Sequence, residues 1–243
     1  MKPQRIFIVR HAQSQGNIDK NIYKDIPDYA LRLTSTGEEQ ARNAGISISS
    51  IIKSQSVQYY VSSFWRTRQT YLHLKKCLQP VMEKYYEDPR IREQEWGQEM
   101  VTRDGYSHEK ENDRDLYGHF YYRFRDEESC ADLYDRVSDF IGTMHRDFEK
   151  KDFPRNVILI THGMTMRLFL MRWFHVPVEE FEQWSNPLNG EYYLLEFRDH
   201  NKKYELITPL KKHIIKHSFQ FPFGEDKKHF PFIHNLPYEL GSR

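Results

Sequence analysis

Two short apolar runs in this chain each lead to a histidine. Residues 6–9 (Ile-Phe-Ile-Val) reach His11 through one arginine, and residues 157–160 (Val-Ile-Leu-Ile) reach His162 through one threonine. A run that is short, apolar at every position and rich in β-branched residues indicates a strand buried on both faces of a parallel sheet. Ligands of open parallel sheets bind at the carboxyl ends of the strands. If these two strands are neighbours, both imidazoles therefore lie at one edge of the sheet.

Helical patterns separate the predicted strands. Residues 36–39 form a capping-box pattern, and Ser129 with Asp132 forms a second cap signal. Apolar residues at helical spacing follow the second cap and indicate one buried helix face: Cys130, Leu133, Val137, Phe140, Met144 and Phe148. The expected elements are strand 6–9, helix 37–53, strand 57–61, a helix capped by Ser62 or Ser63 and running to about 78, a helix over 130–148, strand 157–160, helix 164–174 and hairpin strands 192–197 and 204–207.

Strands that alternate with helices predict a mostly parallel sheet between helical layers, a three-layer α/β/α sandwich. We expect one α/β domain over residues 1–210. The stretch 101–128 is polar, charged and aromatic and interrupts the alternation, so we expect an insertion at 98–128 that caps the pocket. Residues 211–243 form a basic and aromatic C-terminal extension.

The charge balance argues against several classes of protein. The chain has 36 Lys+Arg against 35 Asp+Glu, whereas a dedicated nucleic-acid binder usually has a clear basic excess. Neither a long apolar run nor a signal-peptide pattern occurs, so we expect no membrane span. Cys77 and Cys130 are the two cysteines, too few for a disulfide framework, which favours a reducing, cytoplasmic setting. Lysines in the extension leave a weak peripheral contact open, although a solvated or packed tail is favoured.

Arginines accompany both histidines. Arg10 precedes His11, and Arg66 and Arg68 follow strand 57–61 on the first turns of a helix. The planar guanidinium fork matches phosphate oxygens, and the backbone N–H groups at the helix start after Gly163 add donors for an anion. The sequence contains no Walker-type glycine loop and no carboxylate cluster that suggests a metal. We therefore expect side chains and main-chain donors to hold a phosphoryl group without a cofactor.

Two histidines in such a pocket can have different roles. One can attack phosphorus and carry a covalent phosphoryl group, while the other donates hydrogen bonds to the equatorial oxygens. A general acid is still needed to protonate the departing oxygen, and a carboxyl group held protonated would serve. Glu93 and Glu95 are the candidates, because aromatic neighbours could desolvate either carboxyl.

Taken singly, each of these residues also has an ordinary structural interpretation. A histidine after a strand often only packs, and Arg66 with Arg68 is compatible with a solvated helix face. Glu93 alone is compatible with a surface carboxylate. Their common order along the chain, with several strand ends converging on one edge, is what favours a phosphate pocket.

The order of these motifs resembles the histidine phosphatase superfamily, whose fold is phosphoglycerate-mutase-like and whose signature is an Arg-His-Gly motif. The resemblance extends in order from about residue 5 to about residue 200. A stretch over 118–125 is similar to fungal and plant members described as phosphoglycerate-mutase-like phosphatases. The matching segments are 10–14 with Asn17, 33–41, 62–70, 91–97, 128–136 and 161–163.

The resemblance implies a role for individual residues. His11 would be the phosphohistidine nucleophile, Glu93 the proton donor, and His162 the second catalytic histidine. Arg10, Asn17, Arg66 and Gly163 would bind the phosphoryl group. Arg32, Arg68, Tyr121 and Arg123 are candidates for the substrate rim.

Three positions depart from the family pattern. Ala12 replaces the usual glycine, which raises the question of strain in the loop, and Gln13 replaces an acidic residue. Gln94 stands where the mutases usually have arginine, which favours a hydrolase.

The sequence therefore predicts a metal-independent phosphomonoester hydrolase that works through a phosphohistidine and acts on a small phosphorylated substrate. A phosphoglycerate-type mutase and a non-catalytic phospho-ligand-binding protein of the same fold are the alternatives. The sequence indicates neither the identity of the substrate nor an oligomeric state.

Overall fold

The computed structural model describes residues 2–96, 117–123 and 127–212. In this part of the chain, six strands form one mixed sheet in the order β3-β2-β4-β1-β5-β6. The strands are β1 (Arg5–Arg10), β2 (Val57–Val61), β3 (Glu83–Glu87), β4 (Asn156–Thr161), β5 (Tyr192–Arg198) and β6 (Lys203–Leu206).

The centre of the sheet is parallel and buried. Strand β1 pairs with β4, and β4 pairs with β2, in parallel register, while β5 and β6 are antiparallel. Arg10 lies opposite Thr161, so β1 and β4 end side by side. All residues of β2 and β4 are buried, as expected for short apolar strands covered on both faces. The two strands that lead to the histidines are therefore direct neighbours.

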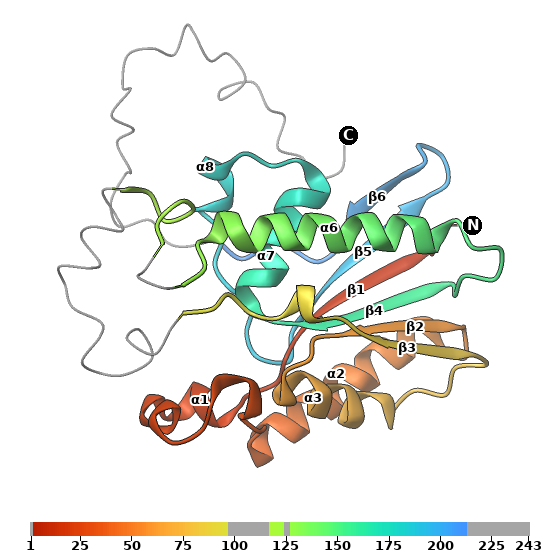
Figure 1. Cartoon of the computed structure of the whole chain (residues 1–243). Helices are drawn as coiled ribbons and strands as arrows, with labels where there is room; N and C mark the ends of the chain where they lie inside the picture. Colours follow the sequence, from red (N-terminus) through yellow and green to blue (C-terminus); the bar gives the residue numbers. More distant parts are fainter. Residues whose placement is uncertain (1, 97–116, 124–126, 213–243) are drawn as a thin grey trace, which may run out of the picture.

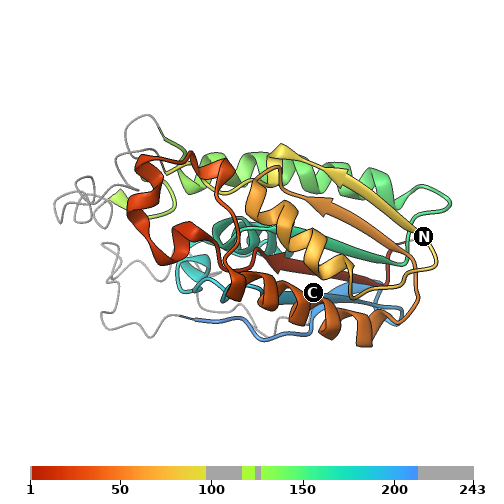
Figure 2. The ribbon, with the colours of Figure 1, turned by 90° about the horizontal axis from the view of Figure 1, so that it is seen from below.

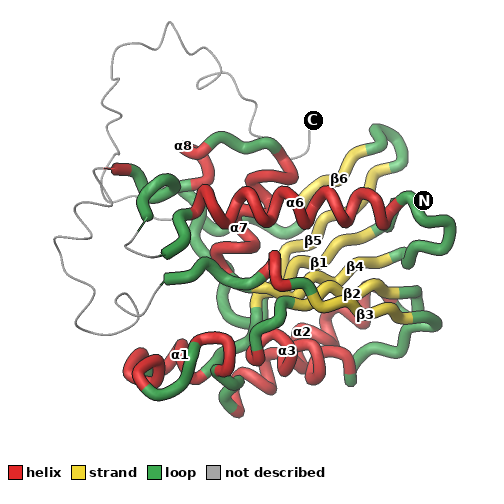
Figure 3. Tube along the Cα trace, viewed as in Figure 1, coloured by secondary structure: helices red, strands yellow, loops and turns green. Residues whose placement is uncertain are grey.

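Helices cover both faces of this sheet (Figures 1 and 3). On one face α2 and α3 pack against Phe7 and Val9, and the view from below shows these helices across the sheet (Figure 2). On the other face α6 and α7 pack against Ile6 and Ile8. The alternation of side chains along β1 thus supplies both cores of a three-layer α/β/α sandwich. The four helices are α2 (Ser35–Ile52), α3 (Trp65–Lys75), α6 (Cys130–Phe148) and α7 (Gly163–Phe174).

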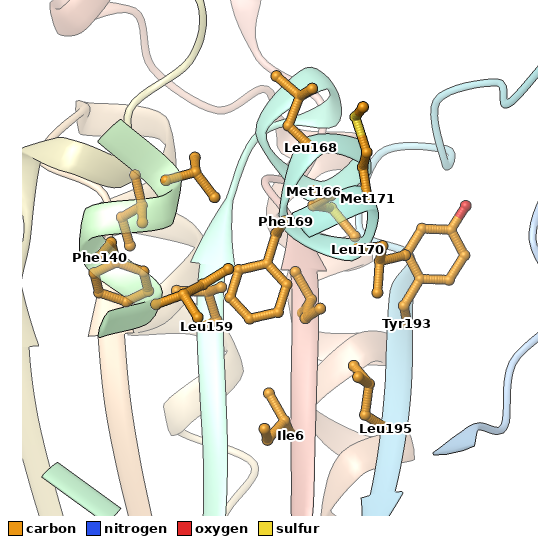
Figure 4. Close-up of a cluster of buried hydrophobic side chains, with 14 of the residues drawn as sticks. Ile6, Phe140, Leu159, Met166, Leu168, Phe169, Leu170, Met171, Tyr193 and Leu195 are labelled. Carbon is orange, nitrogen blue, oxygen red and sulfur yellow. The ribbon is translucent and has the colours of Figure 1, made fainter. Parts of the chain in front are cut away.

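The larger core lies between the sheet and α6 with α7 (Figure 4). Phe140 of α6 and Phe169 of α7 are fully buried against Leu159 of β4. Each fully buried apolar side chain of this size contributes about 1.5–3 kcal/mol. The face predicted from helical spacing over 130–148 is confirmed, since all six of its residues are buried. This packing fixes the start of α7 directly after His162.

Several short elements complete the described part of the chain. They lie in the connections rather than in the layers, and most are single turns. They are α1 (Gln15–Ile18), η1 (Lys20–Lys24), η2 (Asp28–Ala30), η3 (Pro89–Ile91) and α8 (Val178–Phe181).

The structure differs from the sequence predictions about the elements at four points. The helix expected from a capping box over 36–39 begins at Ser35 with Thr34 as its cap, because the Thr34 hydroxyl accepts from the Gly37 N–H. Helix α3 begins after Phe64 and has no side-chain cap, although Ser62 or Ser63 was expected to cap it, because the Ser62 hydroxyl faces His162 instead. The helix also ends at Lys75, before the predicted position 78. Strand β3 was not predicted, since its sequence Glu-Lys-Tyr-Tyr-Glu is polar and mostly exposed on the edge of the sheet.

The predicted cap and extension fall largely outside the described residues. Of the expected insertion at 98–128, residues 98–116 and 124–126 are not described, and of the extension only 211 and 212 are described. Within the described part, Phe120 is buried in the core beside Phe181. No described helix combines the length and the apolar character that a membrane crossing requires.

Candidate active site

The two histidines lie together at the carboxyl edge of β1 and β4. Their ring centroids are 5.1 Å apart, with 59° between the ring planes. The backbone N–H of His11 donates to the Thr161 carbonyl at 2.8 Å, which extends the pairing of the two strands by one step. His11 is 4% exposed and His162 is fully buried. Parallel neighbouring strands therefore bring the two imidazoles into one pocket.

The ring of His11 is fixed by the main chain of its own loop. Its Nδ1 lies 2.9 Å from the carbonyl oxygen of Ala12. A carbonyl oxygen only accepts hydrogen bonds, so Nδ1 carries the proton and Nε2 keeps its lone pair. The loop is held in turn, because the Ala12 N–H donates to Thr70 Oγ1 at 3.0 Å and Asn189 Nδ2 donates to the His11 carbonyl at 3.1 Å. His11 thus presents an unprotonated nitrogen on a fixed ring.

The ring of His162 is held from a different strand. Its Nε2 lies 2.8 Å from the hydroxyl oxygen of Ser62, which follows β2. The ring packs edge-on against Phe64, with centroids 5.2 Å apart. The Nδ1 atom is buried and has no hydrogen-bond partner in the described part of the chain. A buried polar atom of this kind is unfavourable unless a ligand meets it.

Both predicted phosphate-binding arginines reach this pocket. Arg66 is 4% exposed, and its Nη1 donates to the Asp28 carboxylate at 2.8 Å and to the Asp28 carbonyl at 2.7 Å, while Nη2 donates to the carboxylate at 3.3 Å. Arg10 Nη1 donates to the Pro187 carbonyl at 2.5 Å, and its buried Nε has no partner among the described residues. Each guanidinium is therefore anchored at one end and keeps N–H groups for a ligand.

Burial and the arginines keep both imidazoles neutral. Burial lowers the pKa of His11 well below its usual value of 6.5, and the charges of Arg66 and Arg10 lower it further. Burial likewise lowers the pKa of His162 well below 6.5, with Arg66 as the largest charge contribution. A neutral His11 is the form that can act as a nucleophile.

The side chain of Glu93 lies at the N-terminus of α7, the helix that begins directly after His162. One carboxylate oxygen accepts from the Thr165 N–H at 3.3 Å and from its hydroxyl at 3.2 Å, and the other accepts from the Met164 N–H at 3.3 Å. Glu95, the alternative acid, is exposed, and its N–H donates to Glu128. The structure therefore favours Glu93 as the carboxyl group at the pocket.

The main-chain donors after Gly163 are used differently from the prediction. We expected them to bind an anionic ligand, but the N–H groups of Met164 and Thr165 donate to Glu93. The Gly163 N–H donates to no atom in the described residues. A Cβ at this position would lie 2.9 Å from the side-chain Cγ of Asn186, so a larger residue would have to displace that side chain. The carboxylate, rather than an open anion site, occupies most of this helix start.

Asn17 and the departures from the family pattern have structural partners. The Oδ1 atom of Asn17 accepts from Ser14 N at 2.9 Å and from Asn189 Nδ2 at 3.2 Å, so this side chain braces the loop beside His11. Ala12 is not among the described non-glycine residues with positive φ, and it therefore adds no left-handed strain. The Gln13 side chain accepts from the Thr34 hydroxyl at 2.8 Å, next to the start of α2.

The four residues predicted to form the substrate rim make no described contact with the two histidines. Arg32 and Tyr121 are exposed. Arg68 forms an ion pair with Glu87 at 2.6 Å, and Arg123 forms one with Asp132. In the described ranges, none of the four has a hydrogen bond, ion pair or ring contact to His11 or His162.

Residues 20–28 contribute side chains that the sequence analysis missed. The Asp28 carboxylate binds Arg66. Burial lowers the pKa of Lys20, and the charges of Arg66 and Arg10 lower it further. Burial and the Asp28 carboxylate raise the pKa of Tyr23 to about 12. No periodic pattern marks residues 19–30, and their closeness in sequence to His11 is the one available signal. Among the described residues, no three His, Cys, Asp or Glu side chains cluster as a metal site.

Comparisons with known proteins identify the family of this chain. A family described as "Histidine phosphatase superfamily (branch 1)" matches residues 6–208. Phosphoglycerate mutase-like protein AT74 of Arabidopsis thaliana is 36% identical over 207 residues, which cover 80% of this chain and 65% of that protein, so the chain spans slightly less than two thirds of it. Broad-range acid phosphatase DET1 of Saccharomyces cerevisiae is 27% identical over 308 residues, covering 87% of this chain and 90% of that protein.

A solved structure shares the fold. The alpha-ribazole phosphatase of Shigella flexneri superposes with a TM-score of 0.62 at 19% identity, covering 86% of this chain and 96% of that one. At this identity the likeness concerns the fold. The overall fold described above is therefore shared with a solved structure.

Proposed function

Because this chain belongs to the histidine phosphatase superfamily, we propose that it hydrolyses phosphomonoesters through a phosphohistidine formed at His11. One observation carries the proposal: His11 is held by the Ala12 carbonyl at Nδ1, is kept neutral by burial, and faces a second histidine 5.1 Å away. A fixed, unprotonated Nε2 beside two arginines is what an attack on phosphorus requires.

Binding of the phosphoryl group uses the anchored cations. Arg10 and Arg66 donate to the phosphoryl oxygens through the N–H groups that their protein partners leave free. The Nδ1 atom of His162, the Asn17 amide and the Gly163 N–H add further donors. Hydrogen bonds to charged groups contribute about 1.5–3 kcal/mol each. The two guanidinium groups supply the positive charge, so the proposed reaction needs no metal ion.

The first chemical step transfers the phosphoryl group to the protein. The Nε2 lone pair of His11 attacks phosphorus in line with the ester bond, and a P–N bond forms as the P–O bond breaks. The electron pair of that bond goes to the leaving oxygen, which takes a proton from the protonated carboxyl of Glu93. The products are an alcohol, a phosphohistidine and a Glu93 carboxylate.

The second step returns the enzyme to its starting state. Water attacks phosphorus from the side that the alcohol has left, and the Glu93 carboxylate takes its proton. The P–N bond breaks, and its electron pair returns to Nε2 of His11. Inorganic phosphate leaves, and both His11 and Glu93 regain their initial protonation.

Gln94 supports hydrolysis over transfer between hydroxyl groups. It is buried, its amide donates to the Glu128 carbonyl at 2.7 Å, and its oxygen lies 3.4 Å from Cys130 Sγ. This side chain packs internally and presents no cation to a second acidic group of a substrate. This chain therefore lacks the arginine that mutases of the phosphoglycerate type usually have at this position.

Trapping the intermediate tests the proposal. The enzyme is mixed briefly with 4-nitrophenyl phosphate labelled in its phosphoryl group, quenched in alkali and digested. We expect an acid-labile label on the peptide that contains His11, free phosphate in the supernatant, and activity that EDTA does not change. The absence of a labelled peptide would overturn the covalent mechanism. A labelled enzyme that yields an isomer of a natural phosphoester without free phosphate would identify a mutase instead.

A further inference from the structure

The guanidinium of Arg136, on α6, uses all of its donors. Its Nε and one Nη2 hydrogen donate to the Glu128 carboxylate at 2.8 and 2.6 Å. The other hydrogens donate to the carbonyls of Arg90, Arg92 and Glu93 at 2.7, 2.9 and 2.8 Å. A guanidinium has five N–H groups, so every one of them is occupied.

These bonds organise a segment that has little regular structure of its own. Residues 92–96 follow the single turn η3 and belong to no helix or strand. Carbonyls in such a segment need partners when water is excluded. The rigid fork of one arginine binds two of them, those of Arg92 and Glu93, and also the Arg90 carbonyl in the preceding turn. Lysine, with a single charged nitrogen on a flexible stem, cannot reproduce that geometry.

Glu128 completes the arrangement from the other side. Its carboxylate also binds Arg92 at 2.7 Å and accepts from the Glu95 N–H at 3.0 Å. Burial acts to raise the pKa of this carboxyl, but the hydrogen bond and charge of Arg136 hold it below its usual value. An ionised Glu128 therefore keeps the Arg136 guanidinium oriented towards the segment.

Glu93 is consequently held at two points. Its carbonyl accepts from Arg136 at 2.8 Å, and its carboxylate is bonded to the start of α7. The Thr165 hydroxyl also donates to the carbonyl of Arg92 at 2.9 Å. Loss of the guanidinium would remove a donor from all three carbonyls, leave the Arg92 carbonyl with Thr165 alone, and allow the backbone of Glu93 to shift.

We propose that Arg136 is a positioning residue that fixes the backbone of Glu93, so that its carboxyl meets the leaving oxygen of the substrate. The proposal rests on the proposed function, in which Glu93 donates that proton. Misplacement of a general acid affects poor leaving groups most, because a good leaving group departs without full protonation.

Arg90 offers a matched control. Its side chain joins η3, the turn directly before that segment, to α6 through Asp139 at 2.6 Å and Thr143 at 3.0 Å, and it also binds Asp88. It donates to none of the carbonyls that Arg136 binds. An Arg90→Gln variant therefore loosens the contact with α6 without removing the support of Glu93.

The experiment compares Arg136→Gln, Arg136→Lys and Arg90→Gln with the wild type. The substrates are 4-nitrophenyl phosphate, with a good leaving group, and glycerol phosphate, with a poor one. For both Arg136 variants we expect kcat/KM on glycerol phosphate to fall on the order of 10²-fold, and kcat/KM on the aryl ester to change only a few-fold. The ratio kcat/KM is compared because kcat also includes the hydrolysis of the phosphohistidine, in which Glu93 acts on every substrate alike. Arg90→Gln should affect both substrates equally. Thermal unfolding identifies any variant that fails to fold, and Arg136→Lys retains the charge if the glutamine variant fails.

Glu93→Gln separates the two levels of the argument. If Glu93→Gln itself shows no preference for good leaving groups, the proposed role of Glu93 fails. If Glu93→Gln shows that preference but folded Arg136 variants lose both substrates equally, the positioning role alone fails. The same conclusion follows if Arg90→Gln shows the selective loss. We expect the double variant Arg136→Gln with Glu93→Gln to lose no more on glycerol phosphate than Glu93→Gln alone.

Discussion

His11 and His162 occupy equivalent places in the fold, yet their hydrogen bonds differ. Both follow buried parallel strands, and burial lowers the pKa of both well below 6.5. His11 is bound at Nδ1 by a carbonyl of the next residue, whereas His162 is bound at Nε2 by the hydroxyl of Ser62, from another strand. The difference teaches that one residue type at one sheet edge can be held by either ring nitrogen, and this is the basis for the two roles proposed above.

The chemistry of the two partners explains the division of roles. A carbonyl only accepts, so it fixes the proton of His11 on Nδ1 and leaves the Nε2 lone pair available for attack in the free enzyme. A hydroxyl both donates and accepts, so His162 can carry its proton on either nitrogen. That freedom suits a residue that follows changing charge on phosphoryl oxygens rather than one that forms a bond.

Replacing His11 should have the largest effect. His11→Ala removes the only nitrogen that the proposal allows to attack phosphorus, and we expect kcat on 4-nitrophenyl phosphate to fall on the order of 10⁴-fold or more. The measurement is steady-state release of 4-nitrophenol, with thermal unfolding as the check on folding. A folded alanine variant with activity near that of the wild type would contradict the distinction between the two histidines.

Replacing His162 should cost less. His162→Asn removes one donor to the phosphoryl oxygens, a change worth on the order of 10²–10³-fold in kcat. The variant should still form the acid-labile phosphohistidine, only more slowly, as rapid-quench labelling with 4-nitrophenyl phosphate can measure. If His162→Asn forms no label while His11→Ala does, the two roles are reversed.

Removing the hydroxyl that holds His162 should have a smaller effect. A neutral hydrogen bond contributes about 0.5–1.5 kcal/mol net, so we expect Ser62→Ala to lower kcat/KM by about two- to tenfold. Ser63→Ala is the control, since the neighbouring hydroxyl has no hydrogen bond to either histidine in the described residues. Equal losses in the two variants would mean that the bond to Ser62 does not orient the ring.

The lowered pKa values of both histidines also predict a dependence of stability on pH. In the unfolded chain each histidine binds a proton as the pH falls below 6.5, whereas in the folded protein each stays neutral to much lower pH. The unfolded state therefore binds more protons. As the pH is lowered, the free energy of unfolding decreases by up to about 1.4 kcal/mol per pH unit for each histidine. The loss begins near 6.5 and ends at the folded pKa.

Denaturant unfolding between pH 7 and pH 5 measures this slope. His162→Asn should show a shallower slope than the wild type, because one of the two contributions is gone. Ring-proton titration of the folded protein by NMR supplies the independent check. Titration of either ring near 6.5 would show that it is less buried than the structure indicates.

Local pattern predicted most of the fold and the meeting of the histidines. Apolar runs and caps have a direct physical link to strands and helices, and neighbouring parallel strands leave His11 and His162 little choice of position. Long-range polar pairs were out of reach, because nothing local marks Asp28 as the partner of Arg66. Ser62 shows the same limit: its position suggested a helix cap, but its hydroxyl bonds to a histidine 100 residues away.

Ala12 offers the finest test of the comparison, because its carbonyl is what distinguishes His11 from His162. It is fully buried, forms a small cluster with Leu33 and Ala41, and lacks a positive φ. Ala12→Gly should therefore lower the free energy of unfolding by roughly 1 kcal/mol, through lost packing and a more flexible unfolded chain. The backbone carbonyl that binds His11 remains in the glycine variant. We therefore expect kcat on 4-nitrophenyl phosphate to stay within about twofold of the wild type. Denaturant unfolding that shows a more stable glycine variant would reveal strain in this loop, and the tautomer of His11 would then depend on a strained carbonyl rather than a relaxed one.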